Sequence, residues 1–180
     1  MRSKAERKFW DEKNFISIQG SAEKTCLGKK SVNLVVAGQS FHWFNPSLSK
    51  VEFRRILRET GNVALIWNTR SSDGSELNVG YENICRKYSV GYHGSGSLGF
   101  NDDAIGNFFS GDFIYRSMRS SQNLDFKGLL GRYMSASYSL RKEDPLFHEV
   151  SDRMEELFKK YSRDNHVELL YDTEIYIGKP

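Results

Sequence analysis

The stretch that most constrains the fold of this chain runs from Val32 to Phe44 and reads VNLVVAGQSFHWF. A near-continuous apolar run ends at Gly38 and Gln39, and a polar and aromatic cluster follows it. Runs rich in β-branched residues are typical of strands that are buried on both faces, as in parallel sheets. In open α/β sheets the ligand crevice lies outside the carboxyl ends of such strands. The stretch therefore predicts a central strand, Val32–Ala37, with a binding edge at its tip.

A helix and a second strand are predicted directly after this stretch. Asn45 can cap a helix whose first residue is Pro46, and Gly61 is placed to end that helix. The run Val63–Trp67 then has the composition of a second buried strand. Strand, helix and strand over residues 32–67 form one βαβ unit, which is expected to be parallel and right-handed.

The C-terminal half continues the alternation of helices and strands. Helices are predicted where apolar residues recur at helical spacing, and strands where apolar and β-branched residues gather between turn signals. The predicted elements are helices over Glu76–Tyr88 and Phe126–Met134, a helix opened by Pro145, and strands over Phe113–Leu124 and Val167–Ile177. The chain has no internal repeat, and its 180 residues suit one domain spanning residues 1–180.

Composition argues against several classes of protein. The net charge is +3, but basic and acidic residues are mixed, as in Arg141–Asp144, so a nucleic-acid partner is poorly supported. No apolar run approaches the roughly 18 residues of a membrane span, and Met1–Lys13 is too charged for a secretory signal. Cys26 and Cys85 lack metal-ligand spacing, so no metal site is predicted. A cytoplasmic protein with reduced thiols is expected.

Four stretches of the chain resemble a known family. They are Phe15–Leu27, Val32–Phe44, Arg54–Arg70 and Val167–Ile177. In this order they resemble the third strand with its loop, the fourth strand, the fourth helix with the fifth strand, and the final strand of class I S-adenosylmethionine-dependent methyltransferases, type 11-like enzymes of small molecules. The resemblance implies an α/β fold, an incomplete Rossmann-like methyltransferase sheet of strands resembling 3, 4, 5, 6 and 7 with flanking helices. It also implies S-adenosylmethionine as cofactor and a small-molecule methyl acceptor.

The glycine-rich cofactor turn of this family has no counterpart before Phe15. One G-x-G-x-x-G pattern, Gly94–Gly99, lacks the preceding strand and the following helix that the mechanism requires, so it is interpreted as a connector. The resemblance therefore implies that the chain corresponds to about the C-terminal two-thirds of the domain. In the family's strand order, 3-2-1-4-5-7-6, strands 1 and 2 would be missing between Phe15–Ile18 and Val32–Ala37. The chain is then expected to bind the cofactor weakly or not at all. We also expect it to associate with another chain through the exposed edge of Val32–Ala37.

Two short segments are predicted by resemblance to contact the cofactor. Gly20, Ser21, Ala22 and Glu23 fall where the family's third-strand loop meets the adenine, and Ala37, Gly38 and Gln39 fall where the fourth strand meets the amino acid part. Gly20 and Gly38 allow close backbone approach, and the amide of Gln39 can bond to a carboxylate or an ammonium group. The alternative for the first segment is an ordinary strand-to-helix turn with Ser21 as N-cap.

The acceptor side is predicted to begin just after the cofactor edge, with Phe41 and Trp43 lining it. His42 can act there as a general base, because an imidazole titrates near neutral pH. The alternative is that His42 is a packing residue held by a hydrogen bond.

A second group of acceptor residues is predicted much further along the chain. The segment Gln122–Tyr138 resembles one found in a subgroup of the family, in which Arg132 would suit a carboxylate and Tyr138 would line the acceptor mouth. The alternative is a helix C-terminus with local capping bonds.

Three functions of different classes remain open from the sequence. The first is methyl transfer from S-adenosylmethionine to a small molecule, a function for which the chain alone need not be sufficient. The second is a non-catalytic methyltransferase remnant or split half that acts by association with another chain. The third is a small basic nucleic-acid-binding protein.

Overall fold

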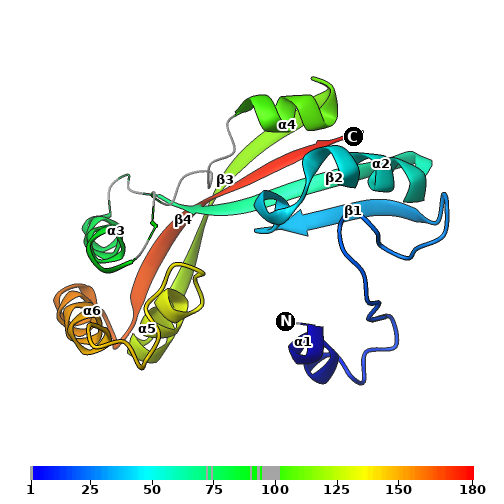
Figure 1. The fold of residues 1–180 in the computed structure, drawn as a ribbon. Helices are drawn as coiled ribbons and strands as arrows, with labels where there is room; N and C mark the ends of the chain where they lie inside the picture. The colour runs from blue at the N-terminus through cyan, green and yellow to red at the C-terminus, as the bar shows by residue number, and fades with distance from the viewer. Residues whose placement is uncertain (1, 72, 74, 90, 93, 95–101) are drawn as a thin grey trace. The chain divides into compact units, whose positions relative to one another are not determined.

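Four strands form one sheet in the order β1-β2-β4-β3. They are β1 (Val32–Gly38), β2 (Leu57–Arg70), β3 (Phe113–Leu124) and β4 (Val167–Gly178). The computed structural model describes residues 2–71, 73, 75–89, 91–92, 94 and 102–180. Figure 1 shows that β4 runs opposite to the other three strands. In the numbering of the methyltransferase sheet this order is 4-5-7-6, which confirms the predicted order of these strands and the α/β fold.

The segment predicted to resemble the third strand does not form one. Phe15–Ile18 has no strand structure and is not part of the sheet, and the side chain of Ile16 is 77% exposed. The preceding helix α1 (Arg2–Lys8) buries none of its residues. A single strand cannot satisfy its backbone groups without a neighbour. The detachment of Phe15–Ile18 therefore agrees with the expectation for a strand that has no neighbour to pair with.

The chain divides into two compact units. The first consists of Met1–Leu65, Asp102–Phe113 and Ile177–Pro180, and the second of Ile66–Asn101 and Ile114–Tyr176. The predicted cofactor edge lies in the first unit, and Arg132 and Tyr138 lie in the second.

Helix α2 (Pro46–Ile56) begins as predicted and ends earlier than predicted. The side chain of Asn45 accepts a hydrogen bond from the Leu48 amide at 3.1 Å, and Pro46 is the first helical residue. The helix ends at Ile56, so the prediction that Gly61 terminates it is wrong. Gly61 lies inside β2, where an added Cβ would come within 3.0 Å of the Asn33 carbonyl oxygen of β1. The glycine therefore permits close approach of two strands.

Strand β1 was predicted to be central and buried on both faces, and the structure corrects this. Ala37 is its one buried residue, whereas Leu34 is 51% and Val36 is 56% exposed. The strand order leaves β1 at the edge of the sheet, with β2 as its neighbour. The exposed edge that the family resemblance implied for Val32–Ala37 is confirmed. The apolar composition of β1 is typical of a strand covered on both faces, but in this position one face of the strand stays exposed.

Aromatic side chains form the core of the first unit. Phe41 is fully buried, and its ring centroid lies 4.8 Å from that of Phe108 and 5.8 Å from that of Phe44. The rings of Phe53 and Phe108 lie 6.2 Å apart. Through these contacts α4 (Asp102–Phe109) packs on α2 and on the short 3-10 helix η1 (Phe41–Trp43).

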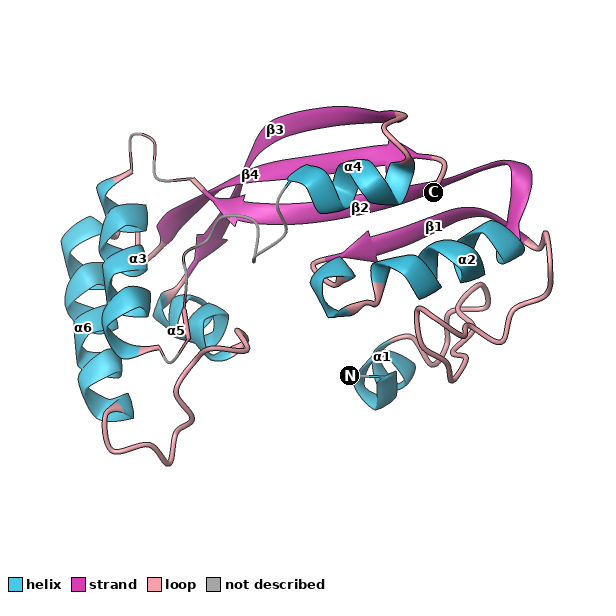
Figure 2. Cartoon of the chain, turned by 45° about the horizontal axis from the view of Figure 1, so that its top comes forward, coloured by secondary structure: helices cyan, strands magenta, loops and turns pink. Residues whose placement is uncertain are grey.

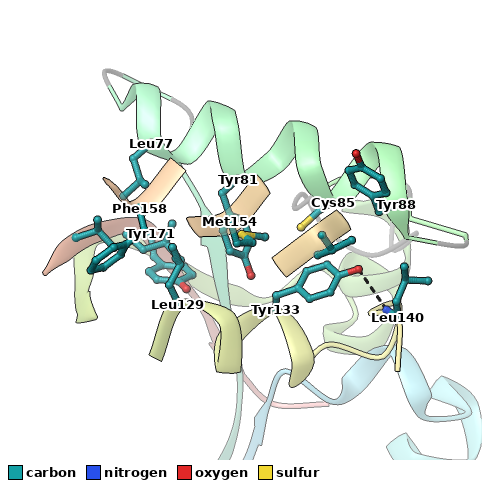
Figure 3. Close-up of a cluster of buried hydrophobic side chains, with 13 residues drawn as sticks. Leu77, Tyr81, Cys85, Tyr88, Leu129, Tyr133, Leu140, Met154, Phe158 and Tyr171 are labelled. Atoms are coloured by element: carbon teal, nitrogen blue, oxygen red, sulfur yellow. Dashed lines mark hydrogen bonds between the residues drawn. The ribbon is translucent and has the colours of Figure 1, made fainter. Parts of the chain in front are cut away.

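Three helices and β4 enclose the core of the second unit. They are α3 (Glu76–Tyr88), α5 (Phe126–Met134) and α6 (Phe147–Tyr161). The first two match their predicted bounds, and α6 begins two residues after Pro145. Helices α3 and α6 lie side by side (Figure 2). Figure 3 shows Tyr81, Cys85, Met154 and Tyr133 between these elements, where the Tyr133 hydroxyl accepts a hydrogen bond from the Leu140 amide at 3.2 Å.

A buried amide fastens α3 to β4. Asn78 is 2% exposed, and its side chain pairs with both backbone groups of Leu170, donating at 2.7 Å and accepting at 3.1 Å. The same amide donates to the carbonyl oxygen of Ser71. Buried backbone groups need partners. The Leu170 carbonyl oxygen also accepts from the Ser71 amide at 3.1 Å, so Asn78 adds to the hydrogen bonds that β4 receives at the end of β2.

Two further sequence observations concern the Gly94–Gly99 pattern and the absence of a membrane-spanning segment. The Gly94–Gly99 pattern lies outside the described residues, except for Gly94. Within the described part of the chain, every helix is too short or too polar to cross a membrane.

Candidate functional site

The predicted adenine loop, Gly20 to Glu23, is a tight turn. Ser21 and Lys24 exchange backbone hydrogen bonds of 3.0 and 3.2 Å across it. No helix follows the turn, so the alternative in which Ser21 caps a helix is wrong. An added Cβ at Gly20 would come within 2.9 Å of the Lys24 carbonyl oxygen. The turn itself therefore requires a glycine at this position, whether or not a ligand approaches.

This turn is bound to the segment that follows β1. The Glu23 carboxylate accepts a hydrogen bond from the backbone N–H of Asn45 at 2.9 Å, although 22 residues separate the two. That bond, with a smaller contribution from the Ser21 hydroxyl, holds the pKa of Glu23 below its ordinary value. The predicted adenine loop and the residues after Trp43 are thus brought together by a charge-assisted hydrogen bond.

A second anchor lies on α2, at the nearly buried carboxylate of Glu52. It accepts hydrogen bonds from the Thr25 amide at 2.8 Å and the Thr25 hydroxyl at 2.6 Å. It also pairs with the Arg55 guanidinium at 2.7 Å. The Arg55 hydrogen bond, followed by that of Thr25, lowers the pKa of Glu52 to about 2. Residues 20–25 are therefore held by hydrogen bonds at two points, Glu23 and Thr25, to the region that carries the predicted cofactor edge.

Replacing Glu52 with Gln should lower the free energy of unfolding at pH 7 by about 1–3 kcal/mol. Because the folded-state pKa is about 2, below its ordinary 4.5, the ionised carboxylate stabilises the protein above pH 4.5. That stabilisation is lost as the pH falls toward 2. Urea unfolding of wild-type and variant proteins from pH 7 to pH 2 should show the difference shrinking across this window.

Glu59→Gln is the matched control, because Glu59 also pairs with a basic residue, Lys30, but is exposed. Exposed ion pairs contribute little to stability, so this variant should behave like the wild type. A Glu52→Gln variant that also behaves like the wild type at pH 7 would contradict the anchoring role of Glu52.

The tip of β1 leaves space next to the backbone. Ala37 is buried, and a Cβ added at Gly38 would meet no atom within 4 Å. Gln39 has a φ of 51°, in the left-handed region that few side chains adopt. This backbone geometry turns the chain sharply at the carboxyl end of the strand, as expected for a binding edge in an α/β sheet.

The three aromatic residues after this turn have different environments. Phe41, predicted to line the acceptor side, is instead a core residue with no exposed surface. Trp43 is 69% exposed, and its ring centroid lies 4.9 Å from that of His42. The periodicity of a 3-10 helix directs neighbouring side chains to different sides, so consecutive aromatics cannot all line one site.

His42 is half-buried, and its Nδ1 atom has no hydrogen-bond partner among the described residues. Burial lowers the pKa of His42 below its ordinary value. The imidazole is therefore neutral at physiological pH, and its buried Nδ1 is left without a hydrogen-bond partner in the part of the chain that the structure describes. The local structure lacks the hydrogen bond that the packing alternative invoked.

Arg132 and Tyr138 come together with residues of α3 and β2 in the second unit. The Arg132 guanidinium donates to the hydroxyls of Tyr171 and Ser135, both at 3.1 Å. The bond to Ser135 is one of the local contacts that the capping alternative predicted. The Tyr138 ring lies 4.4 Å from the Tyr92 ring.

A buried ion pair lies beside these residues, and the sequence analysis did not identify it. Arg70, the last residue of β2, pairs with Glu82 of α3 at 3.1 Å, and both side chains are largely buried. The Tyr92 hydroxyl bonds to both oxygens of the Glu82 carboxylate, at 2.7 and 2.6 Å. A signal for Arg70 existed in the sequence, since a charged residue directly ended a buried strand.

Comparison with solved structures identifies the fold. A candidate type II methyltransferase from Anaeromyxobacter dehalogenans aligns with a TM-score of 0.59 at 15% identity, covering 97% of this chain and 77% of that one. A candidate methyltransferase from Bacillus halodurans aligns with a TM-score of 0.50 at 16% identity, covering 97% and 76%. At such low identity the likeness concerns the fold alone.

Sequence comparison adds homology over part of the chain. An uncharacterized methyltransferase of Mycobacterium tuberculosis is 38% identical over 55 residues, which are 31% of this chain and 23% of that protein. One from Schizosaccharomyces pombe is 45% identical over 53 residues, 29% of this chain and 21% of that protein. Over these residues the chain is similar to proteins named methyltransferases.

The matched residues span less than a quarter of the length of these curated relatives. No family model matches the sequence. The fold and the homology thus agree on the family that the four sequence stretches resemble, whereas the catalytic activity belongs to the proposals that follow.

Proposed function

We propose that this chain takes part in S-adenosylmethionine-dependent methyl transfer to a small molecule. The strand order β1-β2-β4-β3 with β4 reversed supports this most, because it accompanies homology to methyltransferases. When bound, S-adenosylmethionine would supply an activated methyl group. The residues of the chain would then orient the acceptor, exclude water and accept a proton where the acceptor has one to lose.

The cofactor would be held at the carboxyl end of β1 and by the turn before it. The open space beside Gly38 fits close approach of a ligand to the backbone, and Ala37 and Gln39 flank it. The other contacts would come from the turn Gly20, Ser21, Ala22 and Glu23, whose carboxylate already bonds to Asn45. Because that carboxylate is engaged, we assign the ligand contacts of the turn to its backbone and to Ala22.

In the first unit we retain His42 as the general base and Trp43 as an acceptor-binding residue, and in the second unit we retain Arg132 and Tyr138 as acceptor-binding residues. The lowered pKa of His42 supports the role of a base, because the imidazole stays neutral and able to accept a proton. The exposed ring of Trp43 offers an apolar surface. Phe41 is excluded, because it is part of the core.

Two further properties belong to this proposal. The uncovered apolar edge of β1 supports association with a second copy of the chain. Cys26 and Cys85 are free thiols, in keeping with a cytoplasmic location.

An NMR titration with S-adenosylhomocysteine, the demethylated cofactor, tests the proposed function. We expect weak binding, with backbone amide shifts concentrated at residues 20–23 and 37–42. Titration with adenosine should perturb the first segment and not the second, since adenosine lacks the amino acid part. Shifts confined to other parts of the chain at saturating ligand would contradict the proposed cofactor edge.

Substituting Ala for His42 should lower the rate of methyl transfer by about 10²-fold or more and change cofactor affinity little. The rate should be measured from pH 5 to pH 9 with the same acceptor. In the wild type it should rise with pH through the lowered pKa of His42, and in the variant this rise should disappear. An unchanged rate would leave His42 as a packing residue.

A further inference from the structure

In the second unit, two arginines lie close enough to two tyrosines for their charges to act on the tyrosine hydroxyls. The charges of Arg70, at the end of β2, and Arg132, on α5, both act on the hydroxyls of Tyr81 and Tyr138. Tyr81 comes from α3 and has no exposed surface, yet its hydroxyl lacks a hydrogen-bond partner in the described structure. Buried hydroxyls usually find partners, so this cluster is not fully satisfied by its own side chains.

The charge of Arg70 is already neutralised. Its guanidinium lies 3.1 Å from the carboxylate of Glu82, and their side chains are 6% and 15% exposed. Arg70 also donates to the Tyr92 hydroxyl, which bonds to Glu82. This network fixes the Tyr92 ring on which Tyr138 packs. Arg70 is therefore a positioning residue, and its positive charge has no surplus to offer a ligand.

Arg132 differs from Arg70 in having no acidic partner. Its Nε donates to the Tyr171 hydroxyl and its Nη1 to the Ser135 hydroxyl, so both hydrogen-bond partners are neutral. Among the described residues, no carboxylate oxygen lies within 4.0 Å of this guanidinium. A guanidinium carries five N–H groups in a planar fork, so three N–H groups remain available. Arg132 is half-buried, which makes its positive charge less screened than that of a fully exposed arginine.

No other group in the cluster supplies a negative charge that would compensate Arg132. Burial raises the pKa of the hydroxyls of Tyr81, Tyr92 and Tyr138, so they remain neutral. Burial also raises the pKa of the Cys85 thiol to about 11. The acid in the cluster, Glu82, is shared between Arg70 and the exposed Arg86 at 3.5 Å. The cluster therefore carries a net positive charge at physiological pH.

We propose that Arg132 binds the carboxylate group of a small organic acid. A planar guanidinium with free N–H groups matches a carboxylate bidentately, which a single ammonium group cannot do. The role as acceptor site rests on the proposed function, whereas the binding of a carboxylate does not.

The test is an NMR titration of the chain with succinate and with its uncharged analogue, dimethyl succinate. Succinate should perturb amides near Arg132 and Tyr138, and dimethyl succinate should not. Arg132→Gln should weaken succinate binding at least tenfold, and Arg132→Lys should weaken it less, because it keeps the charge and loses the fork. Arg116→Gln is the control, because Arg116 is an arginine of the same unit that is exposed and has a carbonyl oxygen as partner.

Equal affinity of the wild type and Arg132→Gln for succinate would overturn the inference, as would equal binding of the diester or no binding of succinate by the folded wild type. Near-UV circular dichroism checks that each variant is folded. A parallel titration with S-adenosylhomocysteine separates the two proposals. Succinate binding without cofactor binding would leave the carboxylate site in place and give no support to methyl transfer by the chain alone, and cofactor binding without succinate binding would contradict the site alone.

Discussion

Val36→Lys should weaken the proposed self-association of the chain through β1. β1 is an edge strand with an uncharged sequence, Val32–Gly38, and its Leu34 and Val36 side chains are more than half exposed. Proteins usually protect such edges with charges, proline or a covering element. In a symmetric pairing of two β1 strands, each lysine would be brought near a second lysine and lose water. We expect the dissociation constant, measured by sedimentation velocity, to rise at least tenfold.

Val51→Lys is the matched control, because Val51 is a 67% exposed valine on α2 rather than on β1. If association depends on the β1 edge, this variant should associate like the wild type. Equal loss of association in both variants would indicate unspecific apolar contact, and a wild type that is a monodisperse monomer would contradict the proposed association.

Gly38→Val should abolish detectable binding of S-adenosylhomocysteine and leave the fold intact. The added side chain would occupy the open space beside the backbone, where no atom of the chain lies within 4 Å of a Cβ. The substitution should not harm the strand itself, because valine is favoured in strands. We expect the amide shifts at residues 37–42 to disappear in the NMR titration, while the spectrum otherwise remains that of the wild type.

Gly38→Ala should retain part of the binding, since a single methyl group fills less of the space. Gly106→Val provides a control at another glycine whose added Cβ would meet no neighbour. Equal affinity of Gly38→Val and the wild type would remove the tip of β1 from the cofactor site.

Most helices and strands could be predicted because their signals are local. Asn45 caps α2 and Pro46 begins it, as their side-chain chemistry predicts. Helices α3 and α5 have their predicted bounds, and each also begins with a capping side chain, Ser75 and Asp125. A cap acts on residues two or three positions away, so its effect can be recognised without knowing the fold.

Gly61 shows where local signals fail. A glycine after a helical pattern predicts a helix end, but the helix had already ended at Ile56 and Gly61 faces the Asn33 carbonyl of β1. The reason for this glycine is a neighbouring strand that is close in space. Likewise, Phe41 is buried because α4 brings Phe108 onto it, a contact between residues far apart in the sequence.

The sequence named candidate residues for the site, but it predicted only part of the contacts that hold the site together. The sequence placed Gly38, His42 and Arg132 as candidates, and these roles stay predictions. It did not indicate that Glu52 anchors Thr25, or that Arg70 pairs with Glu82. Each of these contacts joins side chains from separate elements, whose relative placement no local pattern encodes.

The sequence by itself determined the types and order of the elements and, through resemblance, the methyltransferase strand order. These follow from hydrophobic periodicity and local capping, which act over a few residues. The tertiary structure alone decided that one face of β1 stays exposed, which aromatic side chain entered the core, and which arginine kept an uncompensated charge. Burial and charge compensation depend on what neighbouring elements bring to a position: Arg70 meets a carboxylate as well as a hydroxyl group, whereas Arg132 meets hydroxyl groups.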